Sequence, residues 1–173
     1  MRFYTQSFLC AVAMLALGGF LVMSAQGLSE QDQKFLQDAA KGGMMEVAMG
    51  QVAEQKAQSE DVKSFGKRMV TDHGKANDEL KSIASKKGVQ LPSKEHTAKW
   101  TSDKAYIDMM VQDHEKDVKK FRQEAEHGGD PELKSFAQNT LPVLEQHLKL
   151  AQETNKSLTA VGSSNRAPGS RNR

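Results

Sequence analysis

Four residues with metal-binding side chains stand in apolar surroundings along this chain of 173 residues. Each belongs to a stripe of apolar residues at heptad spacing, and together they are Glu46, His73, His114 and His147. Imidazole and carboxylate groups supply ligands for zinc, iron or copper at neutral pH. We therefore predict a transition-metal site from these four, which Asp117 could join because it lies three residues after His114 on the same helix face.

The same four side chains have an alternative role that needs no metal. Buried polar groups can hydrogen-bond to one another and hold the register of a helical bundle. Asp72 and Asp113, each directly before a histidine, point more sideways and are expected to support a ligand or to pair helices. The residues alone leave both interpretations open, a metal site and a structural polar layer.

Methionine is concentrated around the same positions. The methionines that follow the N-terminal segment all lie close to Glu46, His73 or His114, and they are Met44, Met45, Met49, Met69, Met109 and Met110. Met69 and Met110 precede their histidines by four residues and share a helix face with them. Thioether beside imidazole would suit Cu(I) or a haem iron, whereas methionine more commonly fills irregular gaps in a core.

Four amphipathic helices are expected to position these residues. The sequence between Ser29 and Leu158 is rich in Ala, Glu, Gln, Lys and Met and has few β-branched runs, which is typical of helices. Capping residues and breakers place the helices at about Glu30 to Ala57, from Ser59 to Gly88, from Ser102 to Gly128, and from Asp130 to Leu158. Pro142 falls inside the fourth helix and should bend it. This pattern predicts an all-α four-helix bundle.

The four polar residues should share one layer of that bundle. Each lies near the middle of its helix, and Glu46 and His73 differ in height by roughly 4 Å at 1.5 Å per residue. The connection from Gly88 to Trp100 could extend roughly 40 Å and so run along the bundle as a crossover, or form a slack hairpin loop. The layer is expected with either connection.

The two ends of the chain have different characters from the predicted bundle at 29–158. Residues 1–25 combine Arg2, an apolar run and small residues, which indicates a secretory signal peptide, with an uncleaved membrane anchor as the alternative. Cys10 is the sole cysteine and lies in this run, so the mature chain has no disulfide and no thiolate site. Residues 162–173 are small, polar and basic and are expected to be a disordered tail.

The charge balance excludes one class of partner. The chain has 24 Lys and Arg against 22 Asp and Glu, without the basic face that nucleic acid requires. We expect no nucleic-acid partner and a chain that is mainly monomeric.

Two short internal repeats give conflicting relations between the helices. MVTDHGK at 69–75 recurs as MVQDHEK at 110–116, which relates the second helix to the third. DVKSF at 61–65 recurs as ELKSF at 132–136, which relates the second helix to the fourth, as a duplicated hairpin would. The two repeats cannot come from one duplication.

A family resemblance rests on four segments. They are GGMMEVAMGQVA from Gly42, DVKSFGKRMVTDHGKANDEL from Asp61, AYIDMMVQDHEKDVKKF from Ala105 and DPELKSFAQNTLPVLEQHLKLAQ from Asp130. The chain resembles, over Gln31 to Thr154, a secreted bacterial family of unknown function often labelled predicted outer membrane protein. The resemblance implies a ferritin-like fold with a crossover between the second and third helices and a place in the periplasm or at the outer membrane. It implies no activity.

The di-iron pattern of ferritin-like proteins is incomplete here. That pattern needs a Glu on each of two helices and a Glu-x-x-His on each of the other two. Glu46 and Asp117 could stand for the first pair, but Val70 and Leu144 occupy the Glu positions before His73 and His147. A conventional di-iron oxidase is therefore not expected.

The leading hypothesis from the sequence is an exported ferritin-like bundle that is not an enzyme. It is expected to bind a transition metal ion, Zn, Fe or Cu, or to serve a stress-related role in the envelope or at a membrane surface. Two alternatives remain: a metal-dependent redox enzyme, and a structural bundle that binds a partner without metal.

Overall fold

The computed structural model describes residues 27–93 and 99–164 and contains four helices in this part of the chain. They are α1 (Glu30–Lys56), α2 (Glu60–Lys87), α3 (Asp103–His127) and α4 (Pro131–Ser164). The predicted signal peptide at 1–25 lies outside the described residues, as does the tail from 165 onward. None of the described helices combines the length and the apolar character needed to span a membrane.

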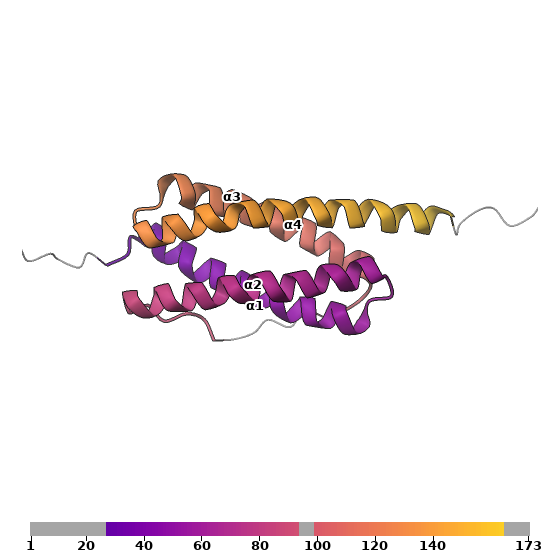
Figure 1. Cartoon of the computed structure of the whole chain (residues 1–173), viewed down its shortest axis with the longest axis horizontal. Coiled ribbons are helices and arrows are strands. Elements are labelled where there is room, and N and C mark those ends of the chain that lie inside the picture. Colours follow the sequence, from indigo (N-terminus) through magenta and orange to yellow (C-terminus); the bar gives the residue numbers. More distant parts are fainter. Residues whose placement is uncertain (1–26, 94–98, 165–173) are drawn as a thin grey trace, which may run out of the picture.

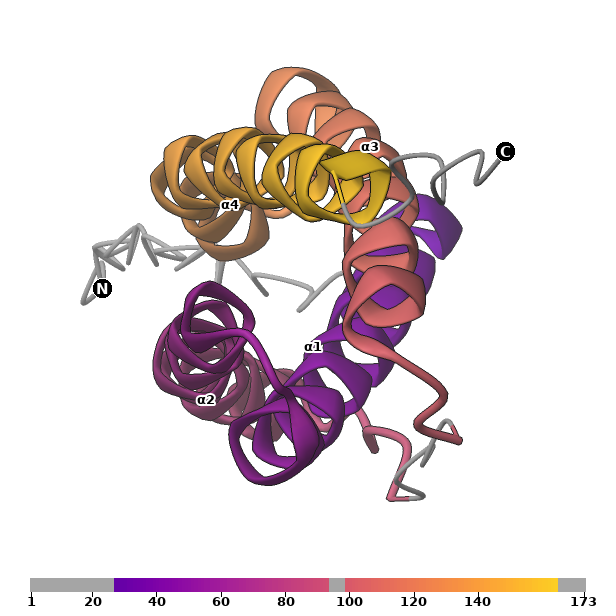
Figure 2. The same ribbon diagram turned by 90° about the vertical axis from the view of Figure 1, so that its right-hand side faces the viewer.

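The helices form one bundle in which α2 and α3 run in the same direction (Figure 1). α1 packs along α2, and α3 packs along α4, so the bundle consists of two antiparallel hairpins (Figure 2). The segment between α2 and α3 begins at one end of the bundle and finishes at the other (Figure 1). The predicted crossover is confirmed, and with it the ferritin-like arrangement.

Local capping accounts for most of the helix boundaries. The hydroxyls of Ser29 and Ser102 accept hydrogen bonds from Asp32 N and Ala105 N, each at 3.1 Å, and so satisfy free N–H groups at the starts of α1 and α3. α2 ends at Lys87 and is capped by Gly88, whose φ of 67° lies in the left-handed region that favours glycine. Ser59 precedes α2 as predicted, but its side chain makes no capping bond.

The capping group of α2 comes from the other hairpin. The carboxylate of Asp103 accepts hydrogen bonds from Gln58 N at 3.0 Å and Ser59 N at 2.7 Å. Asp32 does the same for the turn before α4, where Gly129 N and Asp130 N donate to it at 2.9 and 3.1 Å. These long-range caps tie each hairpin to the turn of the other.

The two caps are related by a single shift along the sequence. Asp32 and Asp103 are 71 residues apart, as are Gln58 and Gly129, and Ser59 and Asp130. The repeat of DVKSF as ELKSF has the same shift, from 61 to 132. The structure thus favours duplication of a helical hairpin, whereas the repeat of MVxDH has a shift of 41 and does not fit that relation.

Small residues on α1 permit a close approach to α2. A Cβ at Gly50 would lie 2.6 Å from the carbonyl oxygen of Gly66, and a Cβ at Gly66 would lie 2.7 Å from that of Gly50. The two helices can therefore pack at this distance only because both positions are glycine. This contact fixes the height of α1 relative to α2.

Two apolar clusters occupy the ends of the core. One includes Phe35, Leu36 and Phe136, and the other includes Phe65, Met69 and Tyr106. The buried polar residues at mid-helix belong to neither cluster. The bundle thus has a polar layer between two apolar ones.

The fourth helix is longer than predicted. α4 continues to Ser164 and takes in residues 162–164, which the sequence assigns to a disordered tail. Pro142 lies inside α4 and leaves the helix unbroken, as predicted. Leu158 is followed by Thr, Ala, Val, Gly and two serines, with no proline to end the helix.

Candidate metal centre in the bundle core

The four mid-helix residues meet in one buried layer. Glu46, His73, His114 and His147 come from α1, α2, α3 and α4, and their exposed fractions are 1, 6, 0 and 0%. The centroids of the three imidazole rings are 5.3 to 5.6 Å apart. One ring nitrogen from each histidine lies within 4.8 Å of one from each of the others.

Glu46 holds His73 by a short contact. His73 Nδ1 lies 2.9 Å from Glu46 Oε2. Burial lowers the pKa of His73, but the charge of Glu46 and this hydrogen bond more than offset it, so the pKa is raised. Burial raises the pKa of Glu46 in turn, but the charge and hydrogen bond of His73 outweigh it, so this pKa is lowered. In the absence of a metal the two form a buried ion pair.

The ring of His114 is oriented by its own helix. His114 Nδ1 lies 2.9 Å from the carbonyl oxygen of Met110 and must therefore donate its hydrogen there. Glu46 Oε1, at 3.5 Å, is a second negative group on the same side. Burial lowers the pKa of His114, so the neutral ring carries its lone pair on Nε2.

The ring of His147 is oriented by a carboxylate of α2. His147 Nε2 lies 2.9 Å from Asp72 Oδ2, which in turn receives a hydrogen bond from Arg68 Nε at 3.3 Å. Burial lowers the pKa of His147 to about 4 despite the neighbouring Asp72. The neutral ring donates from Nε2 and has its lone pair on Nδ1.

The two lone pairs of these neutral rings face each other. His114 Nε2 and His147 Nδ1 are 3.3 Å apart, but neither carries a hydrogen when both outer nitrogens donate to oxygen. His73 Nε2 is buried and has no hydrogen-bond partner among the described residues. A proton or a metal ion could therefore be bound between His114 Nε2 and His147 Nδ1.

Asp117 lies beside the imidazole cluster and is outside the group of three. It borders a cavity of about 20 Å³ that also touches Glu46 and His73. Burial raises the pKa of Asp117 to about 7, and the charge of Glu46 adds to this effect. Its ion pair with Lys120 Nζ is long, at 3.8 Å. Asp117 therefore lies in the wall of the cavity next to the histidine layer.

The aspartates before the histidines have separate roles. Asp72 supports His147, in line with its predicted supporting role, whereas Asp113 pairs with Lys116 at 3.1 Å on the surface. The sequence could not predict that the carbonyl of Met110 orients His114, because every residue has the same backbone carbonyl. It gives no signal for Asn77 either, a buried residue that lines the same cavity as Asp117, because an Asn in a helix is usually a surface residue.

The two methionines before the histidines contribute to the core. Met69 and Met110 are fully buried, and both belong to the apolar cluster around Phe65. Their burial among apolar side chains is consistent with the gap-filling role that the sequence left open for them.

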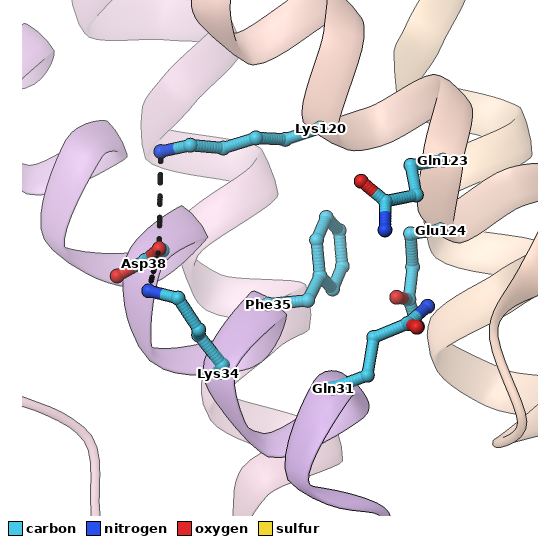
Figure 3. A pocket seen from close by; sticks show the side chains of 7 residues that line it. All are labelled: Gln31, Lys34, Phe35, Asp38, Lys120, Gln123 and Glu124. Carbon is cyan, nitrogen blue, oxygen red and sulfur yellow. Dashed lines mark hydrogen bonds and ion pairs between the residues drawn. The ribbon is translucent and has the colours of Figure 1, made fainter.

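A larger surface groove lies away from this centre. It has a volume of about 260 Å³ between α1 and α3 and is lined by Lys34, Phe35, Asp38, Lys120 and Glu124, with Gln31 and Gln123 (Figure 3). Lys34 and Lys120 both point at Asp38, at 2.9 and 3.9 Å. Both lysines pair with Asp38 and no histidine lines the groove, so the core layer is the stronger candidate for a metal site.

Comparisons with known proteins support the fold and assign no activity. The model of a family described as Domain of unknown function (DUF4142) matches residues 21–154. No curated protein matches the chain. The bundle of a putative spore coat protein from Bacillus halodurans C-125 is similar at 12% identity, with a TM-score of 0.66 over 86% of this chain and 97% of that one.

Two further solved structures have the same arrangement of helices. A DUF305 fragment from Deinococcus radiodurans has 10% identity and a TM-score of 0.63, over 76% of this chain and 99% of that one. A two-domain protein from Anabaena variabilis ATCC 29413, with DJ-1/ThiJ/PfpI-like and ferritin-like domains, has 14% identity and a TM-score of 0.64, over 85% and 43%. At these identities the likeness concerns the fold alone.

Proposed function

Because this chain belongs to the DUF4142 family of unknown function, we propose its function from the chemistry of its core, as a bundle that binds one divalent transition-metal ion. The ligands are His73, His114 and His147. Zinc and copper(II) are the preferred ions, because imidazole nitrogen suits both and binds them more tightly than iron(II).

The observation that supports this proposal is the direction of the three rings. One nitrogen of each ring contacts an oxygen acceptor. The acceptor of His73 is Glu46, that of His114 is the carbonyl of Met110, and that of His147 is Asp72. Metal-bound histidines are commonly held in this way, because the outer hydrogen bond fixes the tautomer and strengthens the ligand. One nitrogen of each ring lies within 4.8 Å of one nitrogen of each of the other two.

The spacing of two inner nitrogens fits a tetrahedral ion. Two nitrogens bound at about 2.0–2.1 Å to such an ion lie about 3.3 Å apart. His114 Nε2 and His147 Nδ1 are separated by 3.3 Å. A pair of neutral imidazoles without a cation would gain nothing from this approach, because two lone pairs repel.

The surrounding charges favour a divalent ion. Glu46 and Asp117 are the acidic groups on this side of the layer, while Asp72 is already paired with Arg68. The ion would offset these two acids and displace the proton from His73 Nε2, while the hydrogen on Nδ1 stays bonded to Glu46. Glu46 and Asp117 therefore act as charge partners of the site, and the three imidazoles as its ligands.

Burial of all three ligands favours a binding role over rapid turnover. We infer that the chain is exported and acts in the periplasm or at the outer membrane, from the signal-like residues 1–25. Such a bundle would retain or buffer a metal ion in the envelope.

The proposal is tested by metal analysis of untagged protein that has been stripped with chelator and reloaded with zinc. We expect one bound equivalent and a higher Tm, since an ion at 100 times its Kd stabilises the folded state by about 2.7 kcal/mol. The variant His114→Gln should no longer bind this equivalent of zinc. His127→Gln is the matched control, because His127 is exposed at the end of α3. Absence of stoichiometric metal together with an unchanged Tm would refute the proposal in favour of a proton-bearing polar layer.

A further inference from the structure

The cavity next to the histidine layer lies among residues of all four helices, of which five are polar and seven are apolar or glycine. It has a volume of about 20 Å³, and its polar lining consists of Glu46, His73, Asn77, Asp117 and Thr140. One water molecule needs at least about 10–15 Å³ measured in this way. The cavity therefore admits a molecule of one or two heavy atoms and nothing larger.

Two of the residues that line the cavity have an acceptor atom without a donor. Glu46 Oε1 and Asn77 Oδ1 are buried acceptors without a hydrogen-bond partner among the described residues. Asn77 is held against α1 at Gly43, where any Cβ would collide with the amide oxygen. A buried acceptor without a partner costs about 1–3 kcal/mol, so these atoms favour an occupant that donates hydrogen bonds.

The charges around the cavity indicate which kind of molecule can bind in it. Two acidic side chains, Glu46 and Asp117, border the cavity and disfavour a small anion. A divalent ion on the three histidines would already offset those two acids, which removes the need for a second cation. A neutral donor satisfies the acceptors without adding charge.

We infer that this cavity is the ligand pocket of the histidine-bound ion and that it selects small neutral hydrogen-bond donors over small anions. The class comprises water, ammonia, hydroxylamine and hydrogen peroxide. This inference rests on the proposed function, because it takes the ion as present. It adds a selectivity that the three histidines alone do not confer, since a bare cationic centre prefers anions.

The test uses full-length protein loaded with one equivalent of Co(II), whose visible absorption reports changes around the ion. Hydroxylamine, which is largely neutral near neutral pH, and fluoride, an anion small enough for the cavity, are titrated separately. We expect a saturable spectral change with hydroxylamine at a concentration at least tenfold below that required for fluoride. An equal or stronger response to fluoride would overturn the inference.

Two variants connect the selectivity to the cavity. Asn77→Leu fills the cavity and should abolish the hydroxylamine response while Co(II) still binds, and the matched control is Asn139→Leu at an exposed position of α4. Thr140→Val keeps the shape of the wall and removes one hydroxyl, so it should weaken the response several-fold in a protein that folds normally. An unchanged response in both variants would refute the inference and leave the metal site intact. A chain that binds no Co(II) would refute the proposed function, and the ligand pocket with it.

Discussion

Replacement of Glu124 by Gln should change how the stability of this bundle depends on pH. Glu124 is 2% exposed near the end of α3. Burial raises its pKa to about 7, and the neighbouring Asp32 adds to this effect. Asp32 stays ionised, because hydrogen bonds from the turn at Gly129 and from Ser29 outweigh the effect of burial and lower its pKa. Below pH 7 the folded protein therefore holds Glu124 mainly in its protonated form.

The difference between the folded and the unfolded pKa of Glu124 determines how the free energy of unfolding changes with pH. The folded pKa of about 7 lies above the ordinary value of 4.5, so the folded protein holds a proton that the unfolded chain releases between these limits. Stability must then fall as the pH rises from 4.5 to 7. At about 1.4 kcal/mol per unit the loss is at most about 3 kcal/mol, and we expect about 2 because the helix end lies near solvent.

The assay is urea denaturation of both proteins across this pH range, with chelator present so that metal binding does not contribute. The amide introduced by Glu124→Gln does not titrate, so the variant should become more stable than the wild type by a margin that grows from near zero to about 2 kcal/mol. The control is Glu126→Gln, at an exposed position of the same helix. A margin that does not change with pH would refute the assignment of Glu124 as a buried neutral acid.

Three further changes test the site and the fold. Asp72→Asn should lower zinc affinity about 10- to 100-fold, since His147 loses its anionic partner; equal affinity by calorimetry would contradict the orienting role of Asp72. Gly66→Ala should cost about 1–3 kcal/mol in urea denaturation, because the new Cβ would lie 2.7 Å from Gly50 O. The matched Gly74→Ala, with open space around it, should be neutral or stabilising. Asp103→Ala should cost about 1–2 kcal/mol, since Gln58 N and Ser59 N lose their acceptor; a wild-type Tm would show that this cap is dispensable.

The boundaries of the helices were accessible from the sequence because they depend on local chemistry. Ser29, Ser102 and Gly88 act within a few residues of themselves, and the structure has the corresponding helix ends. Ser59 is the exception, because its helix start is capped by Asp103 from a distant part of the chain. A side chain that caps a distant helix has no fixed spacing from it in the sequence, so a single sequence cannot reveal the pair.

The convergence of Glu46 with the three histidines was also predictable, since a polar residue in the middle of each apolar stripe must meet the others in any four-helix bundle. The crossover was open to two interpretations on length alone, and the direction of α3 in the folded chain decides between them (Figure 1). The likeness of MVTDHGK to MVQDHEK shows only that two helices place a histidine at the same height.

The tertiary structure alone decided what each member of the layer does. Helix spacing puts Asp117 and His114 on one face, but side-chain packing turns Asp117 toward the cavity and leaves the rings of the three histidines facing one another. Which ring nitrogen is free depends on the acceptor opposite the other, such as Asp72 or the carbonyl of Met110. The sequence by itself therefore determined four helices and a shared polar layer, through local propensity and periodicity. The direction of each ring and the acceptor it contacts depend on how the helices are rotated and packed, which the fold decides as a whole.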